Sequence, residues 1–307
     1  MNRSGFDVVR IDKDMAALSA RKTGIIGGFT LDIPPGHPIL LNLKRYPRYG
    51  MNVPRLARVL HEKYGNMIAI DIGANIGDTV ALIKSGADIP IIAIEGDAGY
   101  FAYLKKNTDL FKDIDCLQLF LGEKGSLISA KIERADGTLR LMDHSQAPNA
   151  EAPAKKEEKE VSVTTLDALL SKDSRVDNMK LLKIDTDGYD LKIIKGGMEY
   201  LKRAKPTIFF EYDPTFFTET GCDGLSTFKD LSSLGYKQAA FYDNYGRFII
   251  SADIADRKLM VQLTSYVKDR QGGFAFYDIC VFHADDNDLA DRLAAEEAKI
   301  NDHEDTR

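Results

Sequence analysis

A glycine-containing turn stands out because it lies where a strand is expected to meet a helix. The turn runs from Asp71 to Asp78 with the sequence Asp-Ile-Gly-Ala-Asn-Ile-Gly-Asp. Gly73 and Gly77 let the backbone turn tightly and let a ligand approach the N–H groups at a helix N-terminus. In a doubly wound sheet, ligands bind outside the carboxyl ends of the strands. The turn therefore predicts a binding site for a nucleotide-like ligand.

The next apolar run ends at Glu95, 24 residues after Asp71. A carboxylate at this place can accept two hydrogen bonds from a ribose diol. The dinucleotide fingerprint has glycine at its second position to admit a pyrophosphate, and Asn75 occupies that position here. The spacing therefore favours a ligand that has ribose and adenine but no pyrophosphate. S-adenosylmethionine is such a ligand.

Further carboxylates follow the later apolar runs. Asp185 ends the run Leu-Leu-Lys-Ile-Asp, Asp187 lies two residues on, and Glu211 is near the end of Thr-Ile-Phe-Phe-Glu-Tyr. Carboxylates at one sheet edge could orient a hydroxyl group or remove its proton. They could also hold a divalent cation, but no histidine joins them and we expect no metal. The alternative for Asp187 and Asp190 is that they only favour the N-terminus of the next helix.

Other side chains are candidates for the wall of the site. His37 lies in a Pro-Gly-His-Pro turn and is a candidate general base, or simply a turn residue. Tyr49 and Arg55 precede the sheet and are candidates for contact with an acceptor, with surface packing as the alternative. Tyr212 follows Glu211 and could line the acceptor pocket or pack in the core.

Short apolar runs alternate with helix-like segments from residue 67 onward. This alternation predicts a mostly parallel, doubly wound α/β sheet. The expected strands are 67–73, 90–96, 115–122, 181–185, 207–212, 236–243, 247–250 and 274–283, and the expected helices are 53–64, 76–86, 98–107, 191–203 (interrupted at Gly196-Gly197), 224–235, Lys258–Val267 and 288–300.

Three parts are expected along the chain. Residues 1–66 are an accessory segment on the substrate side, with strand-like runs at Ile25–Leu31 and Ile39–Leu43. Residues 67–284 are the main domain, and 285–307 are an acidic helix and tail. Within the main domain, 125–142 predict a hairpin with Asp136-Gly137 in the turn. Residues 143–160 have almost no large apolar side chains, so we expect a mobile loop.

Composition limits the class of protein. The net charge is −6, which gives no general attraction to nucleic acid or anionic membranes. The three cysteines are isolated from one another, so neither a disulfide framework nor a structural zinc site is expected. No apolar stretch is long enough to span a bilayer, and the N-terminus is unlike a secretory signal. These features favour a cytoplasmic protein.

Five segments together resemble the FkbM family of methyltransferases, in the same order and spacing across residues 67–213. Similar motifs also occur outside that range, in HPIL, YPRYGMNVPRLARVL and FYDICVFHADD, and resemble members linked to surface polysaccharides. The five segments are DIGANIGDT, AIEGDAGYFAYLKKN, VTTLDAL, LLKIDTDGYDLKIIKGG and TIFFEYD.

The resemblance implies a seven-stranded, Rossmann-like methyltransferase fold. It also implies O-methylation of a hydroxyl group on a sugar, polysaccharide precursor or natural product, with S-adenosylmethionine as cofactor and a small molecule or glycan as acceptor. The turn Asp71–Gly77 would hold the methionine part and Glu95 the ribose. The full expected cofactor set is Asp71, Gly73, Asn75, Gly77, Asp78, Glu95, Gly96, Leu121 and Asp185.

Some positions depart from the family pattern. Asp187 and Asp190 stand where glutamate is common, and Gly96 stands where the family has proline. Two other functions stay open from the residues alone. A nicotinamide-dependent oxidoreductase is disfavoured by Asn75. A non-catalytic module of the same fold is disfavoured by the intact turn, Glu95 and Asp185.

Overall fold

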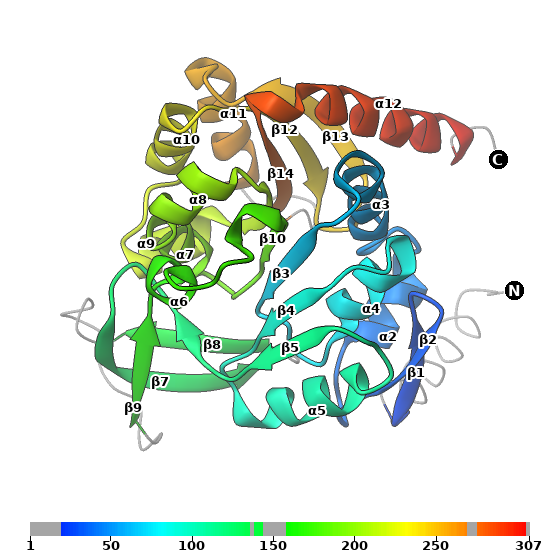
Figure 1. Cartoon of the computed structure of the whole chain (residues 1–307), viewed down its shortest axis with the longest axis vertical. Helices are drawn as coiled ribbons and strands as arrows, with labels where there is room; N and C mark the ends of the chain where they lie inside the picture. Colours follow the sequence, from blue (N-terminus) through cyan, green and yellow to red (C-terminus); the bar gives the residue numbers. More distant parts are fainter. Residues whose placement is uncertain (1–19, 136–137, 144–157, 269–274, 305–307) are drawn as a thin grey trace, which may run out of the picture.

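A computed structural model of the chain describes residues 20–135, 138–143, 158–268 and 275–304. A twisted central sheet with helices on both faces dominates it (Figure 1). The strand order is β13-β12-β14-β11-β10-β3-β4-β5, in which β13 and β14 are antiparallel to their neighbours. The strands are β3 (Ile68–Ile72), β4 (Ile91–Ile94), β5 (Ile114–Leu117), β10 (Met179–Ile184), β11 (Thr207–Tyr212), β12 (Tyr236–Asp243), β13 (Phe248–Asp253) and β14 (Tyr277–His283).

The predicted doubly wound, mostly parallel sheet is therefore confirmed. The resemblance implied seven strands, whereas the sheet has eight, because the strand expected at 247–250 pairs with β12 as β13 at the edge. The central strand β3 has all five residues buried, as expected when helices cover both faces of a parallel sheet.

The two faces of the sheet carry separate hydrophobic cores. Alternate residues along a strand point to opposite faces, so Ile70 of β3 joins one core and its neighbour Ala69 joins the other. The helices packed on the Ile70 face are α6 (Leu166–Leu170), α7 (Asp190–Lys195), α8 (Met198–Ala204), α9 (Pro214–Thr220), α10 (Gly224–Ser233) and α11 (Arg257–Lys268). The elements packed on the Ala69 face are the hairpin β1 (Thr23–Ile26) and β2 (Phe29–Asp32), with α2 (Ile39–Arg45), α3 (Asn52–Tyr64), α4 (Asp78–Gly86), α5 (Ala98–Thr108) and α12 (Asn287–Glu304).

The accessory segment differs from the sequence analysis in two places. The run Ile25–Leu31 is not one strand, because the chain turns at Gly27 and Gly28 and its two halves pair as β1 and β2. Ile39–Leu43, expected as a strand-like run, lies within helix α2. Ile39 and Leu40 are buried and Leu43 packs beside them, which places the apolar side chains on one helical face. The predicted helix at 53–64 is confirmed as α3. None of the described helices is both long and apolar enough to cross a lipid bilayer.

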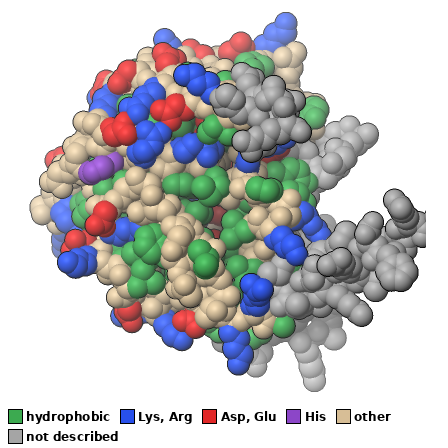
Figure 2. All heavy atoms as spheres, turned by 90° about the vertical axis from the view of Figure 1, so that its right-hand side faces the viewer, with side chains coloured by type: hydrophobic (Ala, Val, Ile, Leu, Met, Phe, Trp, Pro, Cys, Tyr) green, Lys and Arg blue, Asp and Glu red, His purple; other side chains and the backbone are tan. Residues whose placement is uncertain are grey.

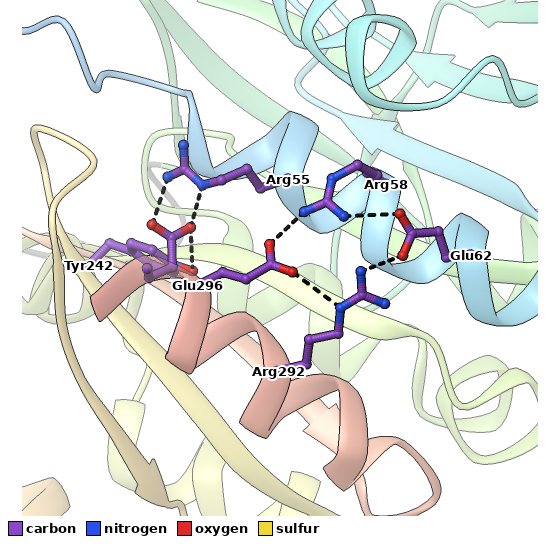
Figure 3. Close-up of polar contacts among 7 residues, drawn as sticks. Arg55, Arg58, Glu62, Tyr242, Arg292 and Glu296 are labelled. Carbon is purple, nitrogen blue, oxygen red and sulfur yellow. Dashed lines mark hydrogen bonds and ion pairs between the residues drawn. The ribbon is translucent and has the colours of Figure 1, made fainter. Parts of the chain in front are cut away.

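A group of ion pairs joins α3 to α12, two helices that lie far apart in the sequence (Figure 3). Arg55 donates to both carboxylate oxygens of Glu297 at 2.7 Å, and the Glu297 side chain is 2% exposed. Arg58 and Arg292 add more exposed pairs with Glu62 and Glu296. We call this group the α3–α12 clasp. Figure 2 views the molecule from the right-hand side of Figure 1. Charged side chains of both signs lie in its upper part, at the height of α12 in Figure 1.

A second sheet with the order β6-β9-β7-β8 stands beside the main one. The expected hairpin at 125–142 is confirmed, although its turn lies outside the described residues. The expected strand 115–122 is divided, because β5 stays in the main sheet and β6 pairs with β9. Most of the expected loop 143–160 is outside the described residues, but 158–160 begin β9 instead. The strands are β6 (Phe120–Leu121), β7 (Ser126–Ala135), β8 (Thr138–Asp143) and β9 (Glu158–Thr164), and the remaining short helices are η2 (Val176–Asn178) and η4 (Ala284–Asp286).

Candidate active site

The turn after β3 is shaped by three residues with positive φ. Gly73, Asn75 and Gly77 have φ values of 75°, 48° and 86°. A Cβ atom on Gly73 would lie 1.8 Å from the carbonyl oxygen of Asp185, so only glycine fits where the ends of β3 and β10 meet. Gly77 is the N-cap of α4 and Asp78 is in its first turn. The turn thus brings the start of α4 to the carboxyl edge of the sheet.

Glu95 follows β4 and is held by two backbone groups. Its Oε2 accepts a hydrogen bond from the N–H of Asn75 at 2.9 Å, and its Oε1 accepts one from the N–H of Asp97 at 2.7 Å. Burial raises the pKa of Glu95 to about 6, although these two N–H groups act in the opposite direction. The carboxylate orientation is therefore fixed by the backbone, while its remaining lone pairs are available to a ligand.

A cavity lies against Glu95 and the turn. Its walls combine apolar side chains with carboxylates and exposed backbone, as is common for cofactor sites. It is lined by Ile72, Gly73, Asn75, Ile94, Glu95, Gly96, Tyr100, Leu119, Phe120, Leu121, Asp185, Thr186, Asp187, Tyr189 and Ile193. We call it the cofactor cavity.

His37 connects the accessory segment to the turn. Its Nδ1 accepts the N–H of Ile39 at 3.3 Å, which leaves the proton on Nε2. Nε2 then donates to Oδ1 of Asn75 at 3.2 Å, and the ring lies edge-on to Tyr100. Burial lowers the pKa of His37, while the bond to Asn75 raises it. Both ring nitrogens are engaged, so this geometry suits positioning of Asn75 better than proton removal.

Lys183 lies at the centre of the sheet edge, beside two of the expected acidic residues. Its Nζ is 3.2 Å from Asp71 Oδ1 and 3.5 Å from Asp185 Oδ2. Burial opposes the charge on Lys183, but the neighbouring carboxylates outweigh it and raise its pKa. Burial also raises the pKa of Asp71 to about 6, against the attraction of Lys183. Asp71 is fully buried and lines neither cavity.

A second, larger cavity shares Gly73, Asn75, Asp185 and Asp187 with the first. We call it the acceptor cavity. It lies between the carboxyl edge of the sheet and the accessory segment. Its lining is His37, Pro38, Ile39, Asn42, Arg45, Tyr46, Tyr49, Gly50, Asn52, Val53, Gly73, Asn75, Asp78, Thr79, Leu82, Lys183, Asp185, Asp187, Phe209, Glu211, Asn244, Tyr245, Phe276 and Asp278.

Carboxylates dominate the charge of the acceptor cavity. Burial is the main cause that raises the pKa of Asp78, Glu211 and Asp278, and the charge of Asp185 adds to it in each case. The same groups raise the pKa of Tyr49 after burial, so its phenol faces them and stays protonated. Among the described residues, no group of three or more His, Cys, Asp or Glu side chains is placed to hold a metal ion.

Asp187 and Asp190 have different surroundings. Asp187 has a positive φ of 50° and lines both cavities. Asp190 is buried at the start of α7, where its Oδ2 accepts hydrogen bonds from the N–H of Thr186 at 3.2 Å and from its hydroxyl at 2.9 Å. Asp190 therefore holds the segment that presents Asp187.

The structure does not bring every expected residue to the site. Arg55 belongs to the α3–α12 clasp and lines neither cavity. Tyr212 is 1% exposed, is stacked against Phe228 and shares a hydrogen bond of 2.8 Å with the hydroxyl of Thr264. Its alternative role in the core is the one that the structure supports. Gly77 shapes the turn but lines neither cavity.

Other residues were not expected at the site. Lys183 and Asp278 each interrupt an apolar strand, and a charged residue in such a run is a signal that it has a specific partner or ligand. Asn52 offers no such signal, because it reaches the cavity only through the position of α3. Phe120 lines the cofactor cavity because the chain leaves the main sheet after β5.

The FkbM methyltransferase domain model matches residues 71–237, which is more than half of the chain. No curated protein sequence matches the chain.

Several solved structures are similar but remote. The FkbM methyltransferase from Methylobacillus flagellatus KT is 15% identical over 91% of this chain and 60% of that one, with a TM-score of 0.35. This chain thus spans only about 60% of that protein's length. The N-terminal domain of human METTL16, in complex with SAH, is 14% identical over 91% and 84%, with a TM-score of 0.41. TYW2 from M. jannaschii, in complex with AdoMet, is 12% identical over 85% and 84%, with a TM-score of 0.37.

Proposed function

The chain belongs to the FkbM methyltransferase family, and on that premise we propose that it methylates a hydroxyl group of a sugar, a polysaccharide precursor or a related natural product. The family assignment supports methyltransferase activity with S-adenosylmethionine as the cofactor. The acceptor and the methylated atom are part of the proposal. The nicotinamide alternative has no support from the family assignment.

The residues of the cofactor cavity fit S-adenosylmethionine. Glu95, fixed by two backbone N–H groups, would accept hydrogen bonds from the ribose hydroxyls. Gly73 and Asn75 of the turn would hold the methionine part, where backbone can approach a ligand closely. Gly96, Phe120 and Leu121 would border the adenosine. The observation that carries the proposal is that this cavity lies beside the acceptor cavity and shares Gly73, Asn75, Asp185 and Asp187 with it.

The bound cofactor supplies a methyl group already activated by its positively charged sulfur. What remains for the protein is to align an acceptor oxygen with that methyl group and to accept the hydroxyl proton. Asp185 lies at the junction of the two cavities, and its side chain is 50% exposed. We assign it the role of orienting or deprotonating the acceptor, with Lys183 holding it in place. Asp187 and Glu211 line the same cavity and are the next candidates.

The composition supports a proposed cellular compartment and a limit on the acceptor. All three cysteines are free thiols, in keeping with a reducing compartment such as the cytoplasm. The net charge of −6 makes nucleic acid an unfavourable acceptor, because its phosphates would be repelled.

A methyl-transfer screen tests the proposed function. Labelled S-adenosylmethionine would be incubated with sugar nucleotides and cell-surface glycans, and label in the acceptor would be counted. We expect Asp185→Asn to reduce transfer about a hundredfold or more while affinity for S-adenosylhomocysteine stays nearly unchanged. If the variant loses cofactor affinity as well, Asp185 belongs to the cofactor site. If transfer is untouched, no carboxylate is needed at that strand end.

A further inference from the structure

Two carboxylates of the acceptor cavity stand directly opposite each other in the sheet. Glu211 of β11 and Asp278 of β14 are register partners across an antiparallel pair. Side chains of such partners point to the same face with their Cβ atoms about 5 Å apart, and like charges there are destabilising. Both residues line the acceptor cavity and both are partly exposed. This pairing has an energetic cost that the fold alone does not explain.

Two cations, Arg45 and Lys183, also line the acceptor cavity, but neither is paired with Glu211 or Asp278. No Lys, Arg or His nitrogen among the described residues forms an ion pair with Glu211 or Asp278. The nearest buried cation, Lys183, is already shared between Asp71 at 3.2 Å and Asp185 at 3.5 Å. The pKa of both paired carboxyls is raised, by burial first and by Asp185 second, and the attraction of Lys183 offsets only part of this rise at Asp278.

A separate observation in the same cavity points to a ligand. Asn52 lines the acceptor cavity and is 1% exposed. Its Oδ1 accepts the N–H of Val53 at 3.0 Å, but its Nδ2 has no hydrogen-bond partner among the described residues. A buried amide N–H without a partner costs about 1–3 kcal/mol. An acceptor oxygen from a ligand would satisfy it.

Aromatic side chains complete the surroundings. Tyr46 of the accessory segment packs on Tyr245, with ring centroids 4.1 Å apart and planes at 31°. Both line the cavity, as does Phe276. Aromatic side chains can pack against the C–H groups of a sugar-like ring, while the carboxylates and the amide bind its polar substituents.

We propose that the acceptor is an amine-bearing, sugar-like molecule whose ammonium group binds between Glu211 and Asp278 while one of its oxygens accepts a hydrogen bond from Asn52. This inference rests on the proposed function and names the chemical class of its acceptor. An ammonium group brings the missing positive charge and three N–H donors for two carboxylates. An acidic sugar or a phosphate would be repelled at the same place.

Glucosamine is the probe, with N-acetylglucosamine and glucose as matched neutral analogues. Binding to the protein loaded with S-adenosylhomocysteine would be measured by calorimetry. We expect glucosamine to bind about tenfold or more tightly than either analogue, because charged hydrogen bonds distinguish it. The double variant E211Q/D278N keeps the shape of both side chains and should bind all three about equally. The control E123Q changes an exposed residue outside both cavities and should keep the preference.

Three results would overturn the inference: equal or undetectable binding of the three sugars to the wild-type protein, a preference that survives in E211Q/D278N, or stabilisation by magnesium chloride that the double variant abolishes. The last would indicate a metal site instead. Affinity for S-adenosylhomocysteine is measured in the same samples. If the wild-type protein does not bind S-adenosylhomocysteine, the proposed function is rejected. If it binds S-adenosylhomocysteine but does not prefer glucosamine, only the amine-bearing acceptor is rejected.

Discussion

The cofactor cavity and the acceptor cavity share a wall but are built differently. In the first, Glu95 is held by N–H groups of Asn75 and Asp97, neighbours on the same two strand-end turns. In the second, Glu211 faces Asp278 across two strands, and the opposite wall comes from the accessory segment before the sheet. In the cofactor cavity, local backbone donors therefore offset part of the cost of burying Glu95. In the acceptor cavity, Glu211 and Asp278 have no ion-pair partner among the described residues, and we propose that a ligand supplies it.

The two cavities therefore differ in how their carboxylates affect the stability of the free protein. Backbone donors reduce the cost of burying a carboxylate, so Glu95 weakens the fold less than it would without them. A pair of opposed carboxylates weakens the free protein, and such a cost is common at functional sites. Variants in the two cavities should therefore differ in their effects on stability and on cofactor affinity. We describe them in decreasing order of expected effect.

Gly73→Ala should have the largest effect, because Gly73 belongs to the wall that both cavities share. The added Cβ would meet the carbonyl of Asp185 at 1.8 Å, in a backbone with a φ of 75°. We expect a loss of about 3 kcal/mol or more in the free energy of unfolding and no measurable binding of S-adenosylhomocysteine.

Gly36→Ala is the matched control for Gly73→Ala, since Gly36 has a φ of 80° but no atom within 4 Å of the added Cβ. It should cost only about 1 kcal/mol through backbone strain. Equal losses in the two variants, measured by chemical denaturation, would show that strain and not the contact with Asp185 shapes the shared wall.

Arg55→Ala tests whether the α3–α12 clasp supports only the acceptor side. The change leaves Glu297 buried without its cation, which should cost about 3 kcal/mol in the free energy of unfolding. Affinity for S-adenosylhomocysteine should not change, because no residue of the clasp lines the cofactor cavity. Arg292→Ala removes an exposed ion pair of the same clasp and should lower the free energy of unfolding by less than about 1 kcal/mol. Weakened cofactor binding in Arg55→Ala would show that the clasp also supports the cofactor cavity, which would contradict this contrast.

Glu95→Ala should affect the cofactor cavity alone. Loss of the carboxylate leaves the ribose hydroxyls without their acceptor, at a cost of about 2–3 kcal/mol or roughly 30- to 150-fold in affinity. Calorimetry with S-adenosylhomocysteine measures this effect, with Glu123→Ala as the exposed control. Unchanged affinity would remove the ribose assignment and with it the contrast between the cavities.

Asp190→Asn should have the smallest effect, visible in how stability depends on pH. Burial first, and then Asp185, raises the pKa of Asp190 to about 6, above its value near 3.8 in the unfolded chain. The folded protein therefore holds this proton more tightly, and the wild type loses stability as pH rises from about 4 to 6. The variant has no such proton.

The melting temperature of Asp190→Asn relative to wild type should consequently rise by about 3 °C between pH 4.5 and pH 7.5. Scanning calorimetry at the two pH values gives the comparison, and other titrating groups largely cancel in the difference. A constant difference would mean that the Asp190 carboxylate is compensated in a way that we have not identified.

The same contrast explains which features could be predicted from the sequence. Gly73, Asn75 and Glu95 form the cofactor cavity through short strand-end turns, so their spacing was enough to place them together. The acceptor cavity depends on long-range packing. Asp278 comes 67 residues after Glu211 and becomes its neighbour only because β14 inserts between β11 and β12. No local pattern indicates that insertion.

Individual errors have the same origin. Arg55 has the residue type of a substrate contact, but α12 supplies Glu297 as its partner from 242 residues away. Ile39–Leu43 has the composition of a strand, yet it is helical because its apolar side chains pack on the core around α3 and α4. In each case the local sequence was compatible with two structures, and a distant element decided between them.

The α3–α12 clasp also has a consequence for how the chain is made. Its buried pair joins residues 242 positions apart, and α12 follows every strand of the sheet in chain order. At about 5–20 residues per second, ribosomal synthesis separates the two halves of the clasp by roughly 10–50 s. During that interval Arg55 has no Glu297, and α3 cannot complete its packing. Assembly of the wall that receives the acceptor is therefore a late event, after the strands that carry the cofactor cavity have emerged.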